Sequence, residues 1–213
     1  MPIQPRSLLQ IAGAPLHPSP PEDSVLLLID AQLEYVDGAV PLNGIDAARR
    51  EALALLTYAR NRRIPVFHLV HHGKPGAAAF DPQGLYAQII PELAPVDGES
   101  VVTKSLPNGF AGTNLDSLIR ATGRGEFIVA GFATHMCVSA TTRAALDLGY
   151  RCTIVANAAA TRDLPHPLSK DLIPEETVQK RRLPRLRIAS QSSSRTPTPL
   201  RMPENRFAAR CAP

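Results

Sequence analysis

The sequence predicts an α/β protein with a doubly wound, mostly parallel sheet covered by helices on both faces, a Rossmann-like three-layer arrangement. Two observations lead to this prediction. Short apolar runs typical of buried strands recur along the chain, and segments with helical periodicity or helix-capping residues lie between them. Because strands joined through helices pair in parallel, this alternation over residues 24–179 favours a single domain. The pattern stops near residue 180, so we expect the C-terminal end of the sheet to be incomplete.

The predicted strands are continuous apolar runs, which are typical of strands buried on both faces. They cover residues 24–29, 65–70, 101–103, 127–130 and 152–155. Helices are predicted at 46–63, at about 116–122 after a capping box that starts at Thr113, at 137–148, and from Pro174 onward. Residues 71–99 are rich in Gly and Pro and are predicted to form a long loop with one helical turn near 85–90. Loops of this length in a compact domain are usually functional, so we expect this loop to contribute to function.

Two segments flank this domain. Residues 1–23 are a Pro-rich extension that we interpret as loose, because Gly and Pro interrupt its apolar patch and argue against a secretory signal. No apolar run approaches the roughly 18 residues that a membrane span requires, so no membrane association is expected. Three cysteines without a close pair favour a reducing compartment, and we expect a cytoplasmic protein.

Residues 180–213 form a basic tail that differs in character from the domain. The tail contains nine Lys and Arg residues against Glu204 alone, so the rest of the chain is on balance acidic. No aromatic residues are interleaved with these charges, so we expect no nucleic-acid partner. Read in another frame, permitted codons for Arg187–Gln191 spell Asp-Arg-Phe-Ala, which suggests a frameshift near residue 180. The alternative is a genuine disordered tail that binds acidic partners.

Three reactive side chains fall at the C-terminal ends of predicted strands. Asp30 follows the first strand, Lys104 follows the third, and Cys137 begins the helix after the fourth. Open α/β sheets build their sites along this edge, so we expect the three side chains to converge. A helix N-terminus lowers the pKa of a thiol, Lys104 would favour the thiolate, and Asp30 could take the thiol proton and return it. Each residue alone is better explained as a core thiol, a surface charge or a strand-end cap.

The segments that carry these residues resemble the three signature segments of isochorismatase-like cysteine hydrolases. They read DAQLEY from Asp30, KSLPNGFAGTNL from Lys104, and GFATHMCV ending one residue after Cys137. They occur in the family's order, and the resemblance covers residues 24 to about 179. It implies an isochorismatase-like fold and a homo-oligomer, either a dimer or a tetramer.

The resemblance also implies a site. An Asp30–Lys104–Cys137 triad would carry the reaction, and a cis peptide bond between Phe132 and Ala133 would aim the Ala133 N–H, beside that of Cys137, at the oxyanion. Family members that cleave vinyl ethers lack the thiol. We therefore expect a cysteine-dependent hydrolase that cleaves a C–N bond of a small amide or ureide through a thioester.

Further residues from these segments and from the end of the second strand are candidates for the substrate pocket. They are Gln32, Tyr35, His71, His72, Phe110 and His135. Tyr35 and Phe110 are equally well explained as core aromatics. His68, His71 and His72 raise the possibility of zinc, but strand alternation turns His71 away from the other two, so we expect no metal and no other cofactor.

A second hypothesis from a different class stays open. The altered C-terminus could leave a catalytically impaired member that acts as a small-molecule-binding or assembly protein. Selective alkylation of Cys137 at neutral pH would favour the enzyme, and reaction no faster than that of a free thiol would favour the impaired member.

Overall fold

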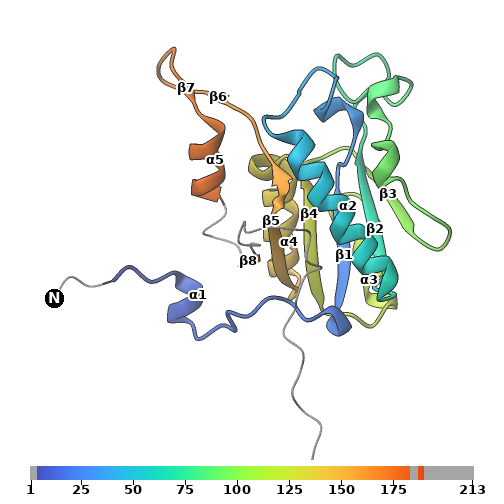
Figure 1. Cartoon of the computed structure of the whole chain (residues 1–213), viewed down its shortest axis with the longest axis vertical. Helices are drawn as coiled ribbons and strands as arrows, with labels where there is room; N and C mark the ends of the chain where they lie inside the picture. The colour runs from blue at the N-terminus through green and yellow to red at the C-terminus, as the bar shows by residue number, and fades with distance from the viewer. Residues whose placement is uncertain (1–3, 183–186, 190–213) are drawn as a thin grey trace, which may run out of the picture.

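The computed structural model describes residues 4–182 and 187–189, and its centre is a parallel sheet with helices on both faces (Figure 1). The strands of this sheet are β1 (Ser24–Ile29), β2 (Val66–His71), β3 (Ser100–Lys104), β4 (Glu126–Phe132), β5 (Arg151–Ala160) and β8 (Arg187–Ala189). Their order is β3-β2-β1-β4-β5-β8 and every neighbouring pair is parallel. The predicted α/β fold with a mostly parallel sheet is confirmed.

Helices and short turns connect the strands. The helices are α1 (Leu8–Ile11), α2 (Ile45–Asn61), α3 (Leu115–Ala121), α4 (Ser139–Asp147) and α5 (Glu175–Arg182). The 3-10 turns are η1 (Pro21–Asp23), η2 (Leu33–Tyr35), η3 (Leu85–Ala87) and η4 (Pro91–Leu93), and η5 (Thr134–Val138) is a π-helical turn. Two short strands of two residues each, β6 (Leu164–Pro165) and β7 (Leu172–Ile173), pair antiparallel.

The central strand β1 shows why the predicted apolar runs form the sheet. All six of its residues are buried, and alternate side chains enter two different cores. Leu26 and Leu28 pack with the apolar face of α2, whereas Val25 and Leu27 pack with residues of α3 and α4. Truncating one such side chain to Ala is expected to cost about 2–5 kcal/mol.

The C-terminal edge of the sheet is held by a close approach of β4 to β1. Gly131 has φ +123°, and a Cβ atom at this position would lie 2.0 Å from the Ile29 carbonyl oxygen. Only glycine allows this contact. The close approach fixes the end of β4 beside the residue that follows β1, which is Asp30.

Two local predictions need correction. The capping box at Thr113 is wrong, because α3 has Asn114 at its N-cap, and the Asp116 carboxylate accepts hydrogen bonds from Tyr150 and Arg120 instead. The helix predicted at 137–148 is preceded by η5, so Cys137 lies inside a helical turn and not at a helix start.

The N-terminal extension is not loose along its whole length. The Ser19 N–H donates to the Thr153 hydroxyl at 2.8 Å, and Arg151 donates to the carbonyl of Pro18 at 2.9 Å. Ser19 is fully buried. This part of the extension is therefore docked on the start of β5.

Ordered elements also occur in the segment where irregular structure was expected. Helix α5 runs to Arg182, and β8 pairs with Thr153–Val155 of β5. The expectation of irregular structure is therefore wrong for these residues, and the rest of the tail lies outside the described residues. The sheet ends on a three-residue strand that pairs with only part of β5.

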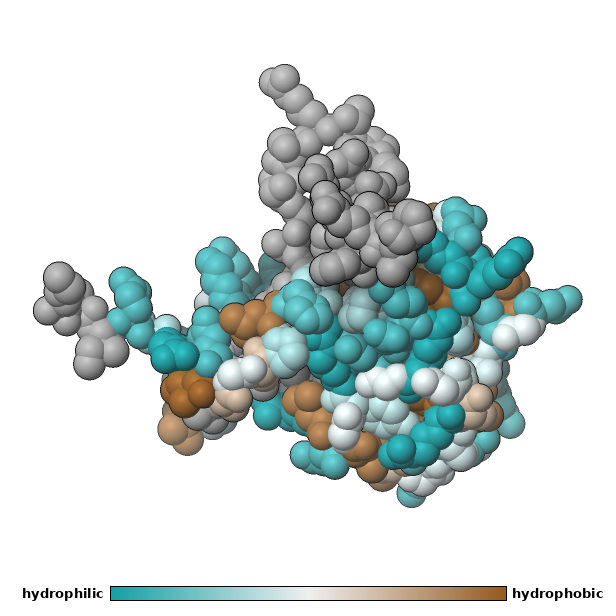
Figure 2. All heavy atoms as spheres, turned by 90° about the horizontal axis from the view of Figure 1, so that it is seen from below, coloured by the Kyte–Doolittle hydropathy of each residue, from teal (hydrophilic) through white to brown (hydrophobic). Residues whose placement is uncertain are grey.

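Seen from the N-terminal edge of the sheet, hydrophobic side chains lie in small separate groups among hydrophilic ones (Figure 2). Ile11 of α1 is one of the large hydrophobic residues that are exposed. Among the described helices, none is long and apolar enough to cross a membrane.

Candidate active site

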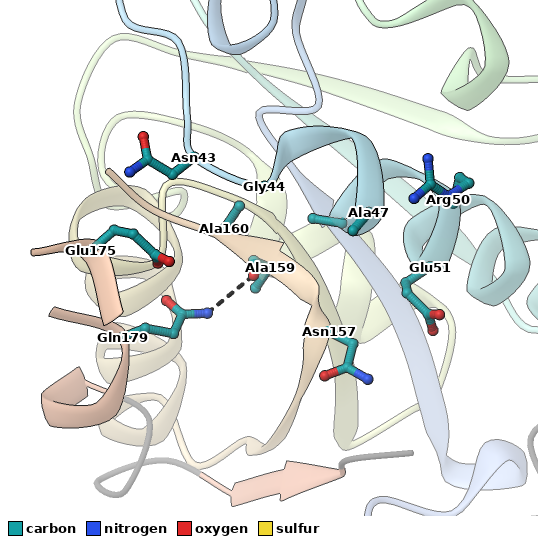
Figure 3. Close-up of a pocket in the computed structure, with 11 residues that line it drawn as sticks. Asn43, Gly44, Ala47, Arg50, Glu51, Asn157, Ala159, Ala160, Glu175 and Gln179 are labelled. Atoms are coloured by element: carbon teal, nitrogen blue, oxygen red, sulfur yellow. Dashed lines mark hydrogen bonds between the residues drawn. The ribbon is translucent and has the colours of Figure 1, made fainter. Parts of the chain in front are cut away.

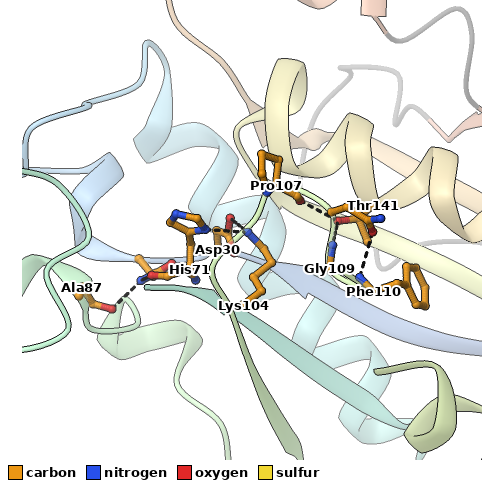
Figure 4. Close-up of polar contacts among 10 residues, drawn as sticks. Asp30, His71, Ala87, Lys104, Pro107, Gly109, Phe110 and Thr141 are labelled. Carbon is orange, nitrogen blue, oxygen red and sulfur yellow. Dashed lines mark hydrogen bonds and ion pairs between the residues drawn. The ribbon is translucent and has the colours of Figure 1, made fainter. Parts of the chain in front are cut away.

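Asp30 and Lys104 meet at the C-terminal edge of the sheet. Asp30 directly follows β1, has φ +50°, and donates its N–H to the Leu69 carbonyl of β2 at 2.9 Å. Lys104 is the last residue of β3. Their side chains, both fully buried, form an ion pair of 2.8 Å between Lys104 Nζ and Asp30 Oδ2 (Figure 4). A left-handed conformation at a non-glycine residue is uncommon and is often found at functional sites.

The second carboxylate oxygen of Asp30 does not take part in the ion pair with Lys104. Within the part of the chain that the structure describes, Oδ1 accepts no N–H or O–H donor. The Cys137 thiol interacts with this carboxylate and with Lys104, and Cys137 is itself only 4% exposed. The three side chains that the sequence singled out are therefore brought together in a site without bulk water.

The electrostatics of the site correct the expected thiol chemistry. Burial raises the pKa of Cys137 to about 12, and the Asp30 carboxylate adds to this rise, while Lys104 opposes it. Burial also raises the pKa of Asp30, opposed by the charge and the hydrogen bond of Lys104. The thiol is thus uncharged at neutral pH, because desolvation outweighs the effects that favour a thiolate.

The turn that carries Cys137 has an unusual hydrogen-bond pattern. The Ala133 carbonyl accepts hydrogen bonds from the N–H groups of Met136 at 3.0 Å and of Val138 at 3.3 Å. It does not accept one from the N–H of Cys137, which lies between them in the sequence. Such π-helical turns are frequent at functional sites. The peptide bond between Phe132 and Ala133 is cis.

Tyr35 and His71 adjoin the three central side chains. The Tyr35 hydroxyl accepts a hydrogen bond from the Ala133 N–H; burial, followed by the charges of Asp30 and Cys137, raises the pKa of Tyr35. His71 Nδ1 lies 3.3 Å from Lys104 Nζ (Figure 4). Burial lowers the pKa of His71 to about 4, and the Lys104 charge lowers it further. A neutral His71 therefore accepts a hydrogen bond from the Lys104 ammonium.

Gln32 and Phe110 do not line this site. Gln32 is fully buried; its amide donates to the carbonyls of His71 and Ala87 and accepts the His71 N–H, so both of its donors are used. Phe110 stacks on Phe127 at 6.3 Å and on Tyr150 at 6.2 Å in the other core. Gln32 holds the backbone of residues 71 and 87 in place beside the site, whereas Phe110 belongs to the packing around α3.

The histidines expected in the pocket have separate partners. His135 Nδ1 lies 2.6 Å from the Thr161 hydroxyl, and the backbone N–H of His72 donates to the Lys104 carbonyl at 2.9 Å. His68 Nε2 lies 2.9 Å from a carboxylate oxygen of Glu99, and burial lowers the pKa of His68. Among the described residues, no group of His, Cys, Asp and Glu side chains is arranged to hold a metal ion.

Sequence reasoning missed Phe80, which lies in the long loop after β2. Its ring makes edge contacts with Tyr35 at 5.3 Å and with His71 at 5.0 Å. Phe80 has φ +56°, and its N–H donates to Glu34 Oε2 at 2.8 Å. The sequence carries no local signal for this contact, because residues 34 and 80 are far apart in the chain.

Thr141 joins the Lys104 segment to the helix after Cys137. Its hydroxyl accepts the Gly109 N–H at 2.9 Å and lies 3.3 Å from the Pro107 carbonyl (Figure 4). Thr141 is fully buried one turn after Cys137. A Cβ atom on Gly109 would lie 2.2 Å from Leu69, so this contact also needs glycine.

Two cavities lie away from these side chains. The larger, about 300 Å³, lies between the start of α2, the end of β5 and α5, where Gln179 donates to the Ala159 carbonyl (Figure 3). The smaller, about 220 Å³, lies beside η2 and the long loop. Neither is lined by Asp30, Lys104 or Cys137.

Known proteins share this fold and these segments. A profile of the isochorismatase domain matches residues 24–170. The chain belongs to the isochorismatase family of hydrolases. A secreted isochorismatase effector of Verticillium dahliae is 36% identical over 159 residues, which cover 75% of this chain and 84% of that protein. The crystal structure of an isochorismatase from Pseudomonas putida KT2440 matches with a TM-score of 0.81 and 36% identity, over 88% of this chain and 96% of that one.

Two further proteins that are similar to this chain have names that describe amide-cleaving enzymes. A ureidoacrylate amidohydrolase of Agrobacterium fabrum is 36% identical over 90 residues, which cover 42% of this chain and 37% of that protein. The structure of an N-carbamoylsarcosine amidase from Thermoplasma acidophilum matches with a TM-score of 0.61 and 26% identity, over 66% of this chain and 85% of that one. The family assignment made from the three segments is confirmed.

Proposed function

We propose that this isochorismatase-family hydrolase cleaves a C–N bond of a small amide or ureide by nucleophilic attack of Cys137, with Asp30 as the general base and acid. The observation that carries the proposal is the buried Asp30–Lys104 ion pair, which leaves Asp30 Oδ1 without a hydrogen-bond partner among the described residues, in a carboxylate that interacts with the Cys137 thiol. A carboxylate that is desolvated, held by one cation and open at one oxygen is a suitable proton acceptor.

In the first half-reaction the Cys137 proton moves to Asp30 as sulfur attacks the substrate carbonyl carbon. The tetrahedral intermediate then expels the amine, and Asp30 returns the proton to the leaving nitrogen. A thioester between Cys137 and the acyl group remains. Because the pKa of the resting thiol is raised to about 12, proton transfer accompanies the attack and does not precede it.

In the second half-reaction a water molecule replaces the amine. Asp30 takes one proton of this water as its oxygen attacks the thioester carbonyl, and returns the proton to the sulfur as the C–S bond breaks. The products are a carboxylic or carbamic acid and the free thiol. Lys104 keeps the charge of Asp30 balanced through both halves and interacts with the thiol as negative charge develops on sulfur.

The N–H groups of Ala133 and Cys137 are the proposed oxyanion donors. The Cys137 N–H does not donate to the Ala133 carbonyl, which accepts its two neighbours instead, and the Ala133 N–H interacts with the Tyr35 hydroxyl, which a substrate oxygen can displace. Backbone donors aimed at a developing oxyanion are among the largest catalytic contributions in acyl transfer. The similarity to a ureidoacrylate amidohydrolase and to an N-carbamoylsarcosine amidase supports an amide or ureide substrate.

The test is ammonia release from a panel of small primary amides and ureides. We expect turnover of at least one compound by the unsubstituted chain, loss of turnover in Cys137→Ala, and a trapped acyl adduct on Cys137 by mass spectrometry. An impaired member that only binds small molecules would bind panel compounds without releasing ammonia. Turnover that survives in Cys137→Ala would exclude the thioester route.

A further inference from the structure

A cluster of rings beside the triad forms an aromatic wall. We use this name for Tyr35, His71 and Phe80. Tyr35 contacts the proposed oxyanion donor Ala133, and His71 contacts Lys104. Phe80 makes edge contacts with both, at 5.3 and 5.0 Å, and Tyr35 also makes an edge contact with Phe132 at 6.0 Å.

The residues of the aromatic wall differ in their exposure to solvent, and the partly exposed ones mark its outer side. Asp30, Lys104 and Cys137 are buried, and so is Tyr35 at 6% exposure. His71 and Phe80 are partly exposed. A compound that reaches the thiol along this side must therefore pass against the rings of the wall.

The position of Phe80 is fixed by its backbone. Its N–H donates to Glu34 Oε2 at 2.8 Å, and its carbonyl accepts the Gly73 N–H at 2.8 Å. The other oxygen of Glu34 accepts the Ala39 N–H at 2.6 Å, and Glu34 is 3% exposed. Phe80 adopts φ +56°, so these contacts hold the ring in a conformation that the backbone alone would rarely adopt.

We infer that Phe80 is a specificity-determining residue and that the aromatic wall selects amides or ureides with a flat, unsaturated group beside the bond that is cleaved. This inference rests on the proposed function and adds a substrate class to it. A planar group gains edge or offset contacts with the rings, whereas a saturated ring of similar size gains only apolar burial. Glu34 is a positioning residue for Phe80 and touches no substrate.

Alkylation of Cys137 tests the wall without a known substrate. The probes are 2-chloro-N-phenylacetamide and 2-chloro-N-cyclohexylacetamide, with rates divided by those for free cysteine and the site identified by peptide mass spectrometry. For the unsubstituted chain we expect a preference of about three- to tenfold for the phenyl probe, the size of one aromatic contact. Phe80→Leu should remove this preference, and Glu34→Gln should reduce it.

Phe110→Leu is the matched control, because Phe110 is also partly exposed but packs in the other core. This variant should keep the preference. An equal rate for the two probes in the unsubstituted chain, or a preference that survives in Phe80→Leu, overturns the role of the wall and leaves the proposed function intact. Failure of both probes to modify Cys137 overturns the wall as the approach to the thiol, while the proposed function is judged separately by ammonia release from the amide panel.

Discussion

Asp30 has two opposite effects on the uncharged thiol of Cys137. Its negative charge raises the thiol pKa and so suppresses the free thiolate, yet the same carboxylate is the proposed acceptor of the thiol proton. These effects act on different reactions. Alkylation by a small reagent needs only the thiolate, whereas amide cleavage needs the proton to be returned to the leaving nitrogen.

The variant Asp30→Asn separates the two effects. Removing the charge leaves the effect of Lys104 on the sulfur unopposed by Asp30, so the thiol pKa should fall and iodoacetamide should modify Cys137 faster at pH 8 than in the unsubstituted chain. Amide turnover should fall by about 10²- to 10⁴-fold, because an amide side chain cannot carry the proton. Parallel losses in both reactions would indicate collapse of the site, and substantial turnover would point to another base such as His135.

The pH dependence of turnover follows from Asp30. Its pKa is raised above the usual carboxyl value by burial, and the carboxylate form is the active one. We expect kcat/KM to fall as the pH decreases through this raised pKa, which places the acid limb above the range of an exposed aspartate. A profile that stays flat down to the ordinary carboxyl range would remove Asp30 from the role of base.

Single residues of the site were predictable where their place followed from a strand end. Asp30, Lys104 and Cys137 come at such ends, so the sequence predicted their convergence. The thiol pKa was not predictable, since the burial of the Cys137 side chain is a tertiary property. Phe80 was missed for a related reason: its contacts come from a loop whose path is set by Glu34.

At the scale of elements, a cluster of charged and polar side chains around Glu99 links the loop before β3 to α2 and β2. Glu99 accepts two hydrogen bonds from Arg60, at 2.8 and 2.9 Å, one from His68 at 2.9 Å, and the Val96 N–H at 3.1 Å. Arg60 also donates to the Ala94 carbonyl. The strands themselves were predictable from their apolar runs, but no sequence pattern links residues 60, 68 and 99.

Glu99→Gln should lower the free energy of unfolding at pH 7 by about 2 kcal/mol, because it removes the charge of a side chain that is only 8% exposed and accepts hydrogen bonds from Arg60 and the buried His68. The matched control is Glu176→Gln, whose pair with Lys180 is more than 70% exposed on both sides and should contribute less than about 0.5 kcal/mol. Urea denaturation measures both. Equal effects of the two variants would show that the cluster does not stabilise the loop.

The same cluster predicts a pH effect with a definite sign. The pKa of Glu99 is lowered to about 2 by its hydrogen bonds to Arg60 and His68, against a value of 4.5 for the unfolded chain. Its contribution is therefore fully present above about pH 4.5 and is lost as the pH falls toward 2. The stability difference between Glu99→Gln and the unsubstituted chain should shrink over this interval.

The whole molecule ends on a weak sheet edge. β8 pairs with Thr153–Val155 only, and the larger cavity adjoins the end of β5 that β8 does not reach. The basic segment was expected to be irregular because its Pro and charge content gives no periodicity, and the pairing of Arg187–Ala189 could not be read from three residues. Sequencing the source DNA tests the frameshift hypothesis, and an intact frame relative to close relatives would contradict it.

A homo-oligomer remains a prediction of the family resemblance. Large hydrophobic side chains such as Met136 and Leu106, at 48% and 52% exposure, lie in the segments that carry Cys137 and follow Lys104. Light scattering coupled to size-exclusion chromatography should give a mass of two or four chains. A single-chain mass at micromolar concentration would contradict this expectation.

The last prediction concerns the uneven protection of the sheet. β1 pairs with β4 along its whole length and with β2 over Leu26–Ile29, whereas β5 has β4 on one side and three residues of β8 on the other. Amides of Leu26–Leu28 should therefore exchange with solvent more slowly than those of Thr153–Val155. Ile188→Pro removes one N–H from β8 and fixes its φ, so it should break the pairing and speed exchange in Thr153–Val155. Exchange in β1 should stay unchanged. Unaltered exchange of Thr153–Val155 in this variant would mean that β8 does not protect the edge, and that β4 alone holds β5 in the sheet.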